Sequence, residues 1–197
     1  EMFGKVAESP QNEETPFYPR SPYGVSKLFG HWMTINYKEA YNIFACSGIL
    51  FNHESPLRGE QFVTRKITRT LARIVHGIEK EVYIGNLDAK RDWGHAKDFV
   101  NAMWLMLQKD KPDDYVIGTG EKHSVKEFAD KAFAHVGLNF EDFIDLDKNL
   151  KRSVESDNRV ADSTKAKKIL KWKPKFSFDE LVADMVESDL ELITNKS

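Results

Sequence analysis

The feature that most limits how this chain can fold is an uninterrupted apolar run at residues 43–51, IFACSGILF. Its length suits a strand, and the lack of alternating polar residues is typical of a strand covered on both faces in a parallel sheet. A helix is expected just before it, over 22–41, because Ser21 can act as its N-cap, Pro22 favours the first turn and Asn42 can end it. We therefore predict that strand 43–51 is central and buried, with this helix packed beside it.

The rest of the chain alternates between helix-like and strand-like segments. Helices are expected at 62–76, 96–108, 124–136, 164–170 and 178–193, and short strands at 81–84 and 114–118. This alternation indicates the α/β class, but the strands are too few for a complete doubly wound sheet, and a glycine-rich dinucleotide fingerprint is missing. We expect a partial Rossmann-type parallel sheet with flanking helices, plus a smaller C-terminal α/β substrate-binding part.

Apolar positions within these helices predict which faces are covered. The helix at 22–41 carries an apolar stripe formed by Val25, Leu28, Phe29, Trp32, Ile35 and Ala40. The helix at 96–108 is expected to point five side chains inward: Phe99, Val100, Met103, Trp104 and Leu107. Ser124 and Glu127 have the spacing of a capping box at the start of the helix at 124–136.

Composition excludes several classes of protein. Hydrophobic residues make up 41% of the 197 residues, and the formal net charge is -2, so nothing points to a nucleic-acid partner or an anionic membrane surface. The single cysteine, Cys46, lies in an apolar setting and is expected to be a core thiol in a reducing, cytoplasmic compartment. The six histidines are scattered, so no metal site is expected.

Tyr23 and Lys27 are four residues apart on the first predicted helix, so their side chains share one face. A lysine ammonium beside a phenol favours the phenolate and lowers the tyrosine pKa. Such a phenolate can take a proton from a sugar hydroxyl while hydride leaves the same carbon. Taken alone, however, the Y-x-x-x-K spacing favours a surface tyrosine and a solvated lysine, because it often occurs by chance.

Longer motifs around this pair change that interpretation. The string PRSPYGVSK at 19–27 resembles the active-site helix of extended short-chain dehydrogenases/reductases. FNHESP at 51–56 and NLDAKRDWGH at 86–95 resemble the GDP-mannose 4,6-dehydratases within that family. The resemblance covers essentially the whole chain and is weakest at 139–161. It implies that residues 1–60 are the end of an NADP-binding Rossmann domain, and that 61–197 mainly bind nucleotide-sugar, with some segments returning to the Rossmann domain. We expect this to be the C-terminal portion of a longer protein.

The resemblance also implies the catalytic and cofactor-binding residues. Tyr23 and Lys27 correspond to the catalytic pair, and Glu1 corresponds to the glutamate that removes the sugar C5 proton in dehydratases. The expected cofactor is NADP, contacted by Tyr23, Lys27, His53 and Arg58. His53 is equally compatible with a turn histidine bonded to the backbone.

The remaining implied residues belong to the substrate, GDP-mannose: Asn52, Lys66, Asn86, Arg91, Arg152 and Glu155. Lys66, Asn52 and Asn86 could instead cap or turn the backbone, and Arg152 could belong to a solvated basic run. The segment 152–157 reads RSVESD where the family has R-P-x-E-V-D, so its loop geometry departs from the family pattern.

The implied activity is that of a lyase that converts GDP-mannose to GDP-4-keto-6-deoxymannose with transient hydride storage on NADP, in a homo-dimer or homo-tetramer. Two alternatives stay open. A nucleotide-sugar epimerase or reductase of the same family would share Tyr23, Lys27 and Arg91 but would not need Glu1. The chain could also be an inactive substrate-binding fragment.

Overall fold

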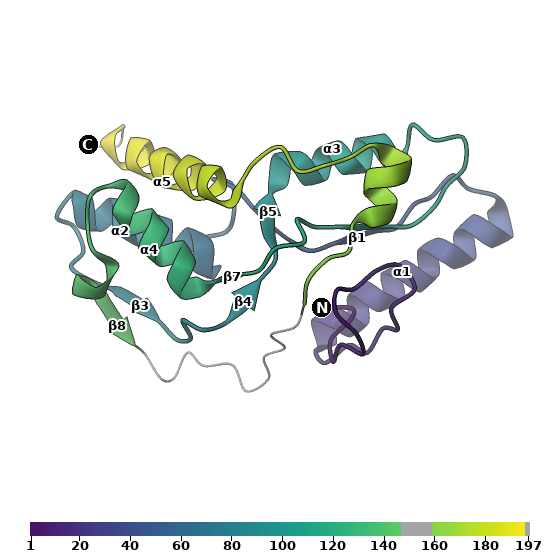
Figure 1. Cartoon of the computed structure of the whole chain (residues 1–197), viewed down its shortest axis with the longest axis horizontal. Helices are drawn as coiled ribbons and strands as arrows, with labels where there is room; N and C mark the ends of the chain where they lie inside the picture. Colours follow the sequence, from purple (N-terminus) through teal and green to yellow (C-terminus); the bar gives the residue numbers. More distant parts are fainter. Residues whose placement is uncertain (147–158, 196–197) are drawn as a thin grey trace. The chain divides into compact units, whose positions relative to one another are not determined.

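The computed structural model describes residues 1–146 and 159–195 (Figure 1). The chain divides into two compact units, each assembled from three separate stretches of sequence. Unit 1 comprises Glu1–His53, Arg91–Lys122 and Val154–Lys175, and unit 2 comprises Glu54–Lys90, His123–Ser153 and Phe176–Ser197. Each unit is described separately below.

The first helix of unit 1, α1, spans Pro22–Tyr41, as expected from the signals at its two ends. The Ser21 hydroxyl accepts a hydrogen bond from the Gly24 amide at 3.0 Å, and Pro22 occupies the first turn. Asn42 ends the helix with a left-handed backbone (φ 51°), a conformation that asparagine tolerates better than most residues. The apolar stripe is not buried, however, because Gly24 is the buried residue of this helix.

The predicted strand 43–51 is much shorter in the structure. Strand β1 covers only Gly48–Leu50 and pairs in parallel with β6 (Tyr115–Ile117), with Ile49 opposite Val116. Ile43 and Phe44 are 46% and 42% exposed, so the expectation of a long buried strand was wrong. Pairing with β6 begins at Ser47, whose amide donates to the Asp114 carboxylate at 2.8 Å and whose carbonyl accepts from the Tyr115 amide at 3.0 Å.

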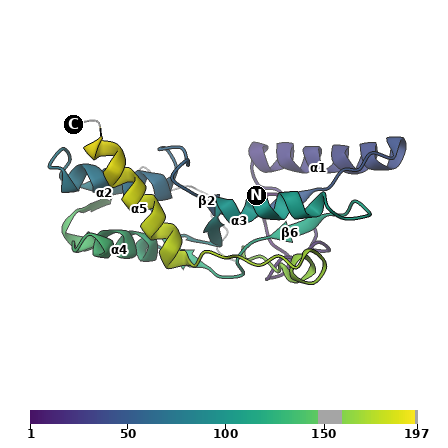
Figure 2. The ribbon, with the colours of Figure 1, turned by 90° about the horizontal axis from the view of Figure 1, so that it is seen from above.

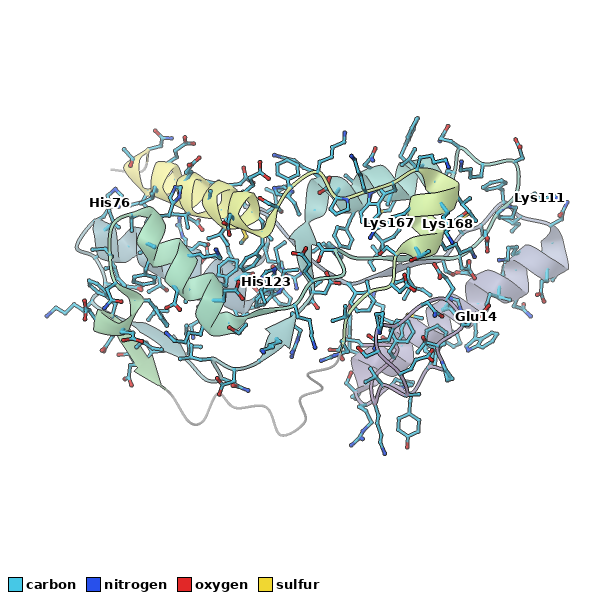
Figure 3. The ribbon with its side chains drawn as sticks, viewed as in Figure 1. Glu14, His76, Lys111, His123, Lys167 and Lys168 are labelled. Atoms are coloured by element: carbon cyan, nitrogen blue, oxygen red, sulfur yellow. The ribbon has the colours of Figure 1, made fainter. Side chains whose placement is uncertain are left out.

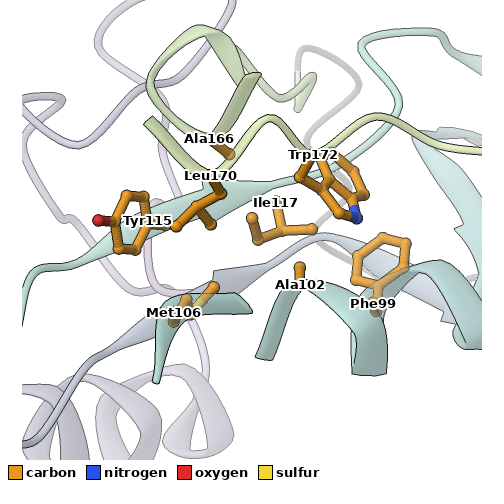
Figure 4. Close-up of a cluster of buried hydrophobic side chains, with 8 residues drawn as sticks. All are labelled: Phe99, Ala102, Met106, Tyr115, Ile117, Ala166, Leu170 and Trp172. Atoms are coloured by element: carbon orange, nitrogen blue, oxygen red, sulfur yellow. The ribbon is translucent and has the colours of Figure 1, made fainter. Parts of the chain in front are cut away.

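Most of the core of unit 1 lies where helix α3 (Ala96–Met106) and β6 meet the chain from 166 to 172 (Figure 4). Its residues are Phe99, Ala102, Met106, Tyr115, Ile117, Ala166, Leu170 and Trp172. Ala166–Leu170 form a π-helical turn, and the Trp172 indole donates to the Asp98 carbonyl at 2.9 Å. Cys46 packs against this cluster, as expected of a core thiol.

The inward face predicted for 96–108 was correct only in part. Phe99 is buried, but the other four predicted positions are exposed: Val100, Met103, Trp104 and Leu107. Within unit 1, α3 uses the narrower face of Phe99, Ala102 and Met106, spaced i, i+3 and i+7. The apolar pattern predicted the helix correctly, but it did not predict how many of the apolar side chains are buried within unit 1.

Unit 2 is built from three packed helices and a short parallel sheet. Helices α2 (Val63–Val75), α4 (Val125–His135) and α5 (Phe178–Thr194) pack against one another, as Figures 1 and 2 show. Strand β3 (Val82–Ile84) pairs in parallel with β8 (Ile144–Leu146), which follows a 3-10 turn at Phe140–Asp142. Parallel pairs in both units, each flanked by helices, agree with the predicted α/β class.

A buried ionic cluster holds α2 against α5 in unit 2. The buried Asp189 carboxylate of α5 accepts from Arg65 Nε and Nη2, each at 2.8 Å, and from the Thr68 hydroxyl at 2.8 Å. Arg65 also donates through Nη1 to the carbonyl of Pro56. Because removing one partner of such a cluster leaves charge buried without compensation, these contacts fix how α2 and α5 pack.

Side-chain caps set the starts of two helices in unit 2. Ser177 and Glu180 form a complete capping box at α5. Ser124 caps α4 by accepting from the Glu127 amide at 3.0 Å, but the Glu127 carboxylate contacts His123 at 2.9 Å, which differs from the predicted capping box. Four short strands complete the described elements: β2 (Asn52–Glu54) pairs with β5 (Trp93–His95), while β4 covers Lys90–Arg91 and β7 covers His123–Ser124.

Two features of the described residues bear on function: the grouping of their potential metal ligands and the apolar character of their helices. None of their His, Cys, Asp and Glu side chains form a group of three that could hold a metal ion. His76 and His123, for example, lie at separate places in unit 2 (Figure 3). None of the helices within 1–146 and 159–195 has the length and apolar character needed to span a membrane.

Candidate functional site

The Tyr–Lys pair lies at the start of α1 in unit 1. Lys27 Nζ is 5.3 Å from the centroid of the Tyr23 ring, so the two side chains share a face as their spacing predicts. Tyr23 is 59% exposed, which leaves its hydroxyl open to a ligand. The pair therefore has the proximity and the access that proton transfer to a bound hydroxyl requires.

A carboxylate lies close to the same helix start. The Ser21 hydroxyl, which caps α1, donates to Glu1 Oε2 at 3.1 Å, and Arg159 Nη1 donates to Glu1 Oε1 at 3.0 Å. Burial alone raises the pKa of the Glu1 carboxyl, but nearby positive charge and donated hydrogen bonds, among them those of Arg159 and Ser21, hold this pKa below its usual value. Glu1 is thus an ionised carboxylate that two donors orient. It lies beside the N-cap of the helix that carries Tyr23.

Arg159 is a functional candidate that sequence reasoning missed. It lies 158 positions from Glu1, in the segment where the family resemblance is weakest, and no recognisable motif contains it. Only the folded chain places its guanidinium on the Glu1 carboxylate. A possible signal was the single arginine just after the charged stretch at 139–158, but its partner could not be read from the sequence.

Asn52 and His53, two further predicted residues in unit 1, lie on β2. Asn52 is exposed. His53 Nδ1 lies 3.0 Å from the Phe51 carbonyl, and because a carbonyl only accepts, this nitrogen carries the proton and leaves Nε2 for another partner. The ring also lies against Phe99, with centroids 5.0 Å apart. His53 therefore makes the backbone contact that was the alternative to a cofactor role, and its Nε2 takes no part in that contact.

Arg91, the predicted diphosphate ligand, is half-buried on β4 beside a buried carboxylate that sequence reasoning also missed. Asp92 accepts four hydrogen bonds, at 2.6–3.1 Å, from the Thr119 amide and hydroxyl and from the amides of Gly120 and Ala161. A Cβ on Gly118 would lie 2.4 Å from the Ala161 Cβ, so this close approach requires glycine. Asp92 thereby ties the chain next to Arg91 to two distant loops.

The predicted residues of unit 2 have other neighbours. Arg58 Nε lies 3.2 Å from Glu54 Oε2, and its guanidinium stacks on the Phe62 ring at 3.6 Å. Burial raises the pKa of the Glu54 carboxyl, although a hydrogen bond from Thr64 and the charge of Arg58 oppose the rise. Arg58 thus has a planar guanidinium fixed in place, as phosphate recognition favours.

The remaining predicted substrate residues have different surroundings. Lys66 lines a pocket on α2. The Asn86 side chain accepts from the Asp88 amide at 3.0 Å, which is the backbone-turning role considered as its alternative. Arg152 and Glu155 lie outside the described residues. The structure therefore brings Glu1 to the start of the helix that carries Tyr23 and Lys27, and it places Arg58, Lys66 and Asn86 in the other unit.

Comparison with known proteins gives a consistent result along the chain. Residues 1–185 match the family described as GDP-mannose 4,6 dehydratase. GDP-mannose 4,6 dehydratase 1 of Arabidopsis thaliana is 58% identical over 192 residues, covering 98% of this chain and 53% of the relative. The human GDP-mannose 4,6 dehydratase is 53% identical over 210 residues, covering 98% of this chain and 56% of the relative. The chain therefore spans about half the length of the curated relatives it matches.

Solved structures also resemble this fold. RMD from Pseudomonas aeruginosa, solved in complex with NADPH, has a TM-score of 0.89 at 22% identity. The match covers 97% of this chain and 64% of the RMD chain. The dTDP-glucose 4,6-dehydratase of Bacillus anthracis, in complex with NAD, has a TM-score of 0.79 at 22% identity, with 95% and 58% covered. At these identities the likeness concerns the fold alone, and it confirms the expected Rossmann-type α/β class.

Proposed function

Since the chain belongs to the GDP-mannose 4,6 dehydratase family, we propose that it forms part of a hydro-lyase that converts GDP-mannose to GDP-4-keto-6-deoxymannose. The observation that supports this most directly is the grouping at the start of α1, where Tyr23 and Lys27 share a face and Ser21 holds the Glu1 carboxylate. An epimerase needs the Tyr–Lys pair, but it has no use for a second, separate base. Glu1 therefore favours the dehydratase.

The proposed cofactor is NADP, which when bound accepts a hydride from C4 of the sugar and returns it at C6. The candidate residues of unit 1 fit part of such a site. Tyr23 and Lys27 are exposed, and His53 keeps Nε2 outside its backbone contact. Arg58 would contribute a fixed guanidinium for phosphate. Because the chain spans only about half of its relatives, the rest of the cofactor site would come from a region like their remaining half.

The chain's own residues then divide the proton transfers between them. Tyr23, with Lys27 on the same face of α1, takes the proton of the O4 hydroxyl while C4 is oxidised. The ketone makes the C5 proton acidic, and the ionised Glu1 carboxylate removes it. The C6 hydroxyl leaves with that proton as water. When hydride is returned at C6, C5 takes up one proton exchangeable with solvent, which balances the proton that Tyr23 accepted from O4. Ser21 and Arg159 keep Glu1 oriented for this step.

We further propose that the nucleotide is bound by Arg91 at its diphosphate and by Asn52, Lys66 and Asn86 elsewhere, with Arg152 and Glu155 completing the site. A homo-dimer or homo-tetramer in the cytoplasm is proposed for the assembled enzyme. Exposed apolar side chains on α1, among them Phe29 and Trp32, support an assembly that covers them. The half-buried thiol of Cys46 fits a reducing compartment.

Product analysis tests this function. The chain is joined to a region like the remaining half of its relatives and incubated with GDP-mannose and NADP in deuterated water, and the sugar is identified by NMR and mass spectrometry. We expect a 4-keto-6-deoxy sugar with deuterium at C5 and no net consumption of cofactor. In Glu1→Gln, which keeps the size of the side chain but removes the base, both the product and the deuterium at C5 should be lost.

The alternatives give different results in the same experiment. An epimerase would return a hexose that keeps O6, and a reductase would consume reduced cofactor in proportion to product. An inactive binding fragment would give no product under any of these conditions. Each of these results would contradict the dehydratase proposal.

A further inference from the structure

A cavity of about 460 Å³ in unit 2 is lined by one residue of the proposed nucleotide site, Lys66, and otherwise by residues that have no role in the steps described above. One wall is a face of α2, and the other walls are the chain from Glu79 to Tyr83 and the side chain of Glu60. Its charged and polar lining from α2 consists of Lys66, Arg69, Thr70 and Arg73. All of these residues belong to unit 2, so the cavity is defined within one compact body.

The spacing of the α2 residues concentrates positive charge on this face. Positions 66, 69, 70 and 73 follow the i, i+3, i+4 and i+7 pattern, so they form one stripe on the helix. Three of the four are cationic, and Lys80 adds a fourth cation to the lining. Like charges at such spacing destabilise a helix unless anions lie between them. Three glutamates line the same cavity, Glu60, Glu79 and Glu81, so a further anion can bind only to the cations that they do not hold.

Arg69 has hydrogen-bonding capacity that its neighbours do not use. Its side chain is only 10% exposed, yet Nε and Nη1 have no hydrogen-bond partner in the described part of the chain. The nearest carboxylate oxygens are Glu60 Oε1, 3.5 Å from Nε, and Asp189 Oδ1, 3.6 Å from Nη1. Both distances exceed an ordinary N–H···O bond, and Asp189 is already occupied by Arg65 and Thr68. Buried guanidinium donors in this state call for a further acceptor.

Glu60 occupies the place where that acceptor would bind. Its side chain is 59% exposed and carries a carboxylate against the edge of Arg69 without a hydrogen bond. An exposed carboxylate held this loosely can swing into solvent when a stronger acceptor arrives. Lys66 has no ion-pair partner among residues 1–146 and 159–195, whereas Arg73 is held by Glu79 at 2.8 Å. Arg69 and Lys66 are thus the two cations of the stripe that are open to a ligand.

We propose that this cavity binds the phosphate group of a small phosphorylated ligand, with the Arg69 fork and Lys66 as donors and Glu60 moving aside. An arginine fork matches phosphate with two parallel hydrogen bonds, and a lysine adds a point charge. Lys66 also belongs to the proposed nucleotide-sugar site, so the phosphate could come from GDP-mannose or from a separate ligand. The recognition chemistry is the same in both cases, and it does not depend on dehydratase activity.

Inorganic phosphate is the probe for the test. The protein is titrated with it while the Nε–H resonance of Arg69 is followed by NMR and the affinity is measured by calorimetry. The Arg69 resonance should shift on binding. Arg69→Lys keeps the charge that faces Asp189 but removes the guanidinium fork. It should weaken phosphate binding about tenfold or more, which corresponds to a loss of about 1.4 kcal/mol or more for one bidentate contact.

A second variant predicts the opposite change. Glu60→Gln removes the competing carboxylate from an exposed position, so it should tighten phosphate binding severalfold. This result cannot arise from damage to the fold. Lys126→Gln is the matched control, because it removes a cation of unit 2 that lies on α4 outside the cavity, and it should leave phosphate affinity unchanged. If wild type shows no Arg69 shift, or if all three variants bind phosphate equally, the proposal is wrong.

Competition identifies the source of the phosphate. If GDP-mannose displaces phosphate from this cavity, the ligand is the nucleotide-sugar itself; if both bind together, the ligand is a separate phosphorylated molecule. Both results support a phosphate site. Failure of the proposed function is a distinct outcome, because the protein would then bind phosphate at Arg69 while giving no dehydrated product.

Discussion

Helix α1 of unit 1 and helix α2 of unit 2 are equally regular, but they are stabilised in different ways. In the 20 residues of α1, Gly24 is the buried one, and the large apolar side chains along the helix are exposed. In the 13 residues of α2, eight are buried, among them Ile67 and Leu71. Helix α1 thus buries few side chains in the core of unit 1, whereas α2 buries most of its residues in the core of unit 2.

The comparison separates the contacts that stabilise a helix from the side chains that it presents for function. Helix α1 is fixed at its ends, by the Ser21 cap and the left-handed Asn42, so its first turn can present Tyr23 and Lys27 without burying them. Helix α2 is fixed by packing and by the buried cluster around Asp189, so its arginines are held in set positions. Four pairs of substitutions test this contrast.

The largest loss is expected where α2 is held to α5. Asp189→Ala leaves the guanidinium groups of Arg65 and Arg69 buried without their carboxylate, which should cost ~3–5 kcal/mol of unfolding free energy. The matched control is Asp179→Ala, which removes an α5 carboxylate that is 71% exposed and pairs with Lys131, and it should cost about 0–1 kcal/mol. Urea unfolding measures both, and similar losses in the two variants would contradict the assigned role of the cluster.

A pair of apolar truncations compares the two helices directly. Leu71→Ala on α2 removes a fully buried side chain and should cost ~2–5 kcal/mol through lost burial and a cavity. Phe29→Ala on α1 removes a larger side chain that is 67% exposed, and it should change stability by less than about 0.5 kcal/mol. These values apply to the isolated 197-residue chain studied by thermal or urea unfolding. A large loss from Phe29→Ala would show that α1 is packed after all.

The α1 cap should have a smaller but local effect. Ser21→Ala removes the acceptor of the Gly24 amide and should cost about 1 kcal/mol. Hydrogen exchange at the Gly24 amide should accelerate, while the amides in the middle of α2 should not change. Ser26→Ala is the control, because that exposed hydroxyl bonds to the Tyr23 carbonyl and does not cap the helix. Equal exchange in both variants would remove Ser21 from its role.

The smallest effect concerns the pH dependence of unit 2. Burial raises the pKa of Glu54 in the folded state, so its contribution to stability is present below the unfolded pKa and is lost as pH rises through the folded pKa. Glu54→Gln cannot titrate, so the stability of wild type relative to this variant should fall as pH rises from the acid range toward neutrality. Glu39→Gln, on the exposed surface of α1, should show no such trend. A stability difference that grew toward neutral pH would reverse the assigned sign.

The parts of the fold that could be predicted from sequence are those set by neighbouring residues. The ends of α1 and the serine cap of α4 depend on contacts within a few positions. The extent of strand 43–51 and the buried face of α3 could not be predicted in this way. An apolar side chain shows that burial is favourable, but it does not show which element supplies the cover.

The same distinction applies to the candidate site. Tyr23 and Lys27 are four residues apart, and their shared face follows from helical geometry. Arg159 reaches Glu1, and Asp92 reaches Thr119 and Ala161, across long stretches of sequence that carry no matching pattern. Only the folded chain brings such partners together, so these residues emerged from the structure alone.

The most direct test of the account is to compare the hydroxyl of Tyr23 with another tyrosine hydroxyl on the same helix. The chain is joined to a region like the remaining half of its relatives. Turnover of GDP-mannose and the dissociation constant for GDP-mannose are then measured for Tyr23→Phe and for Tyr37→Phe, which removes the same group from an exposed position farther along α1. We expect Tyr23→Phe to lower turnover by about 10²–10⁴-fold, the usual contribution of a general base, with binding nearly unchanged. Tyr37→Phe should resemble wild type in both measurements. If Tyr23→Phe kept near-normal turnover, α1 would not carry the chemistry, and the central claim would be wrong.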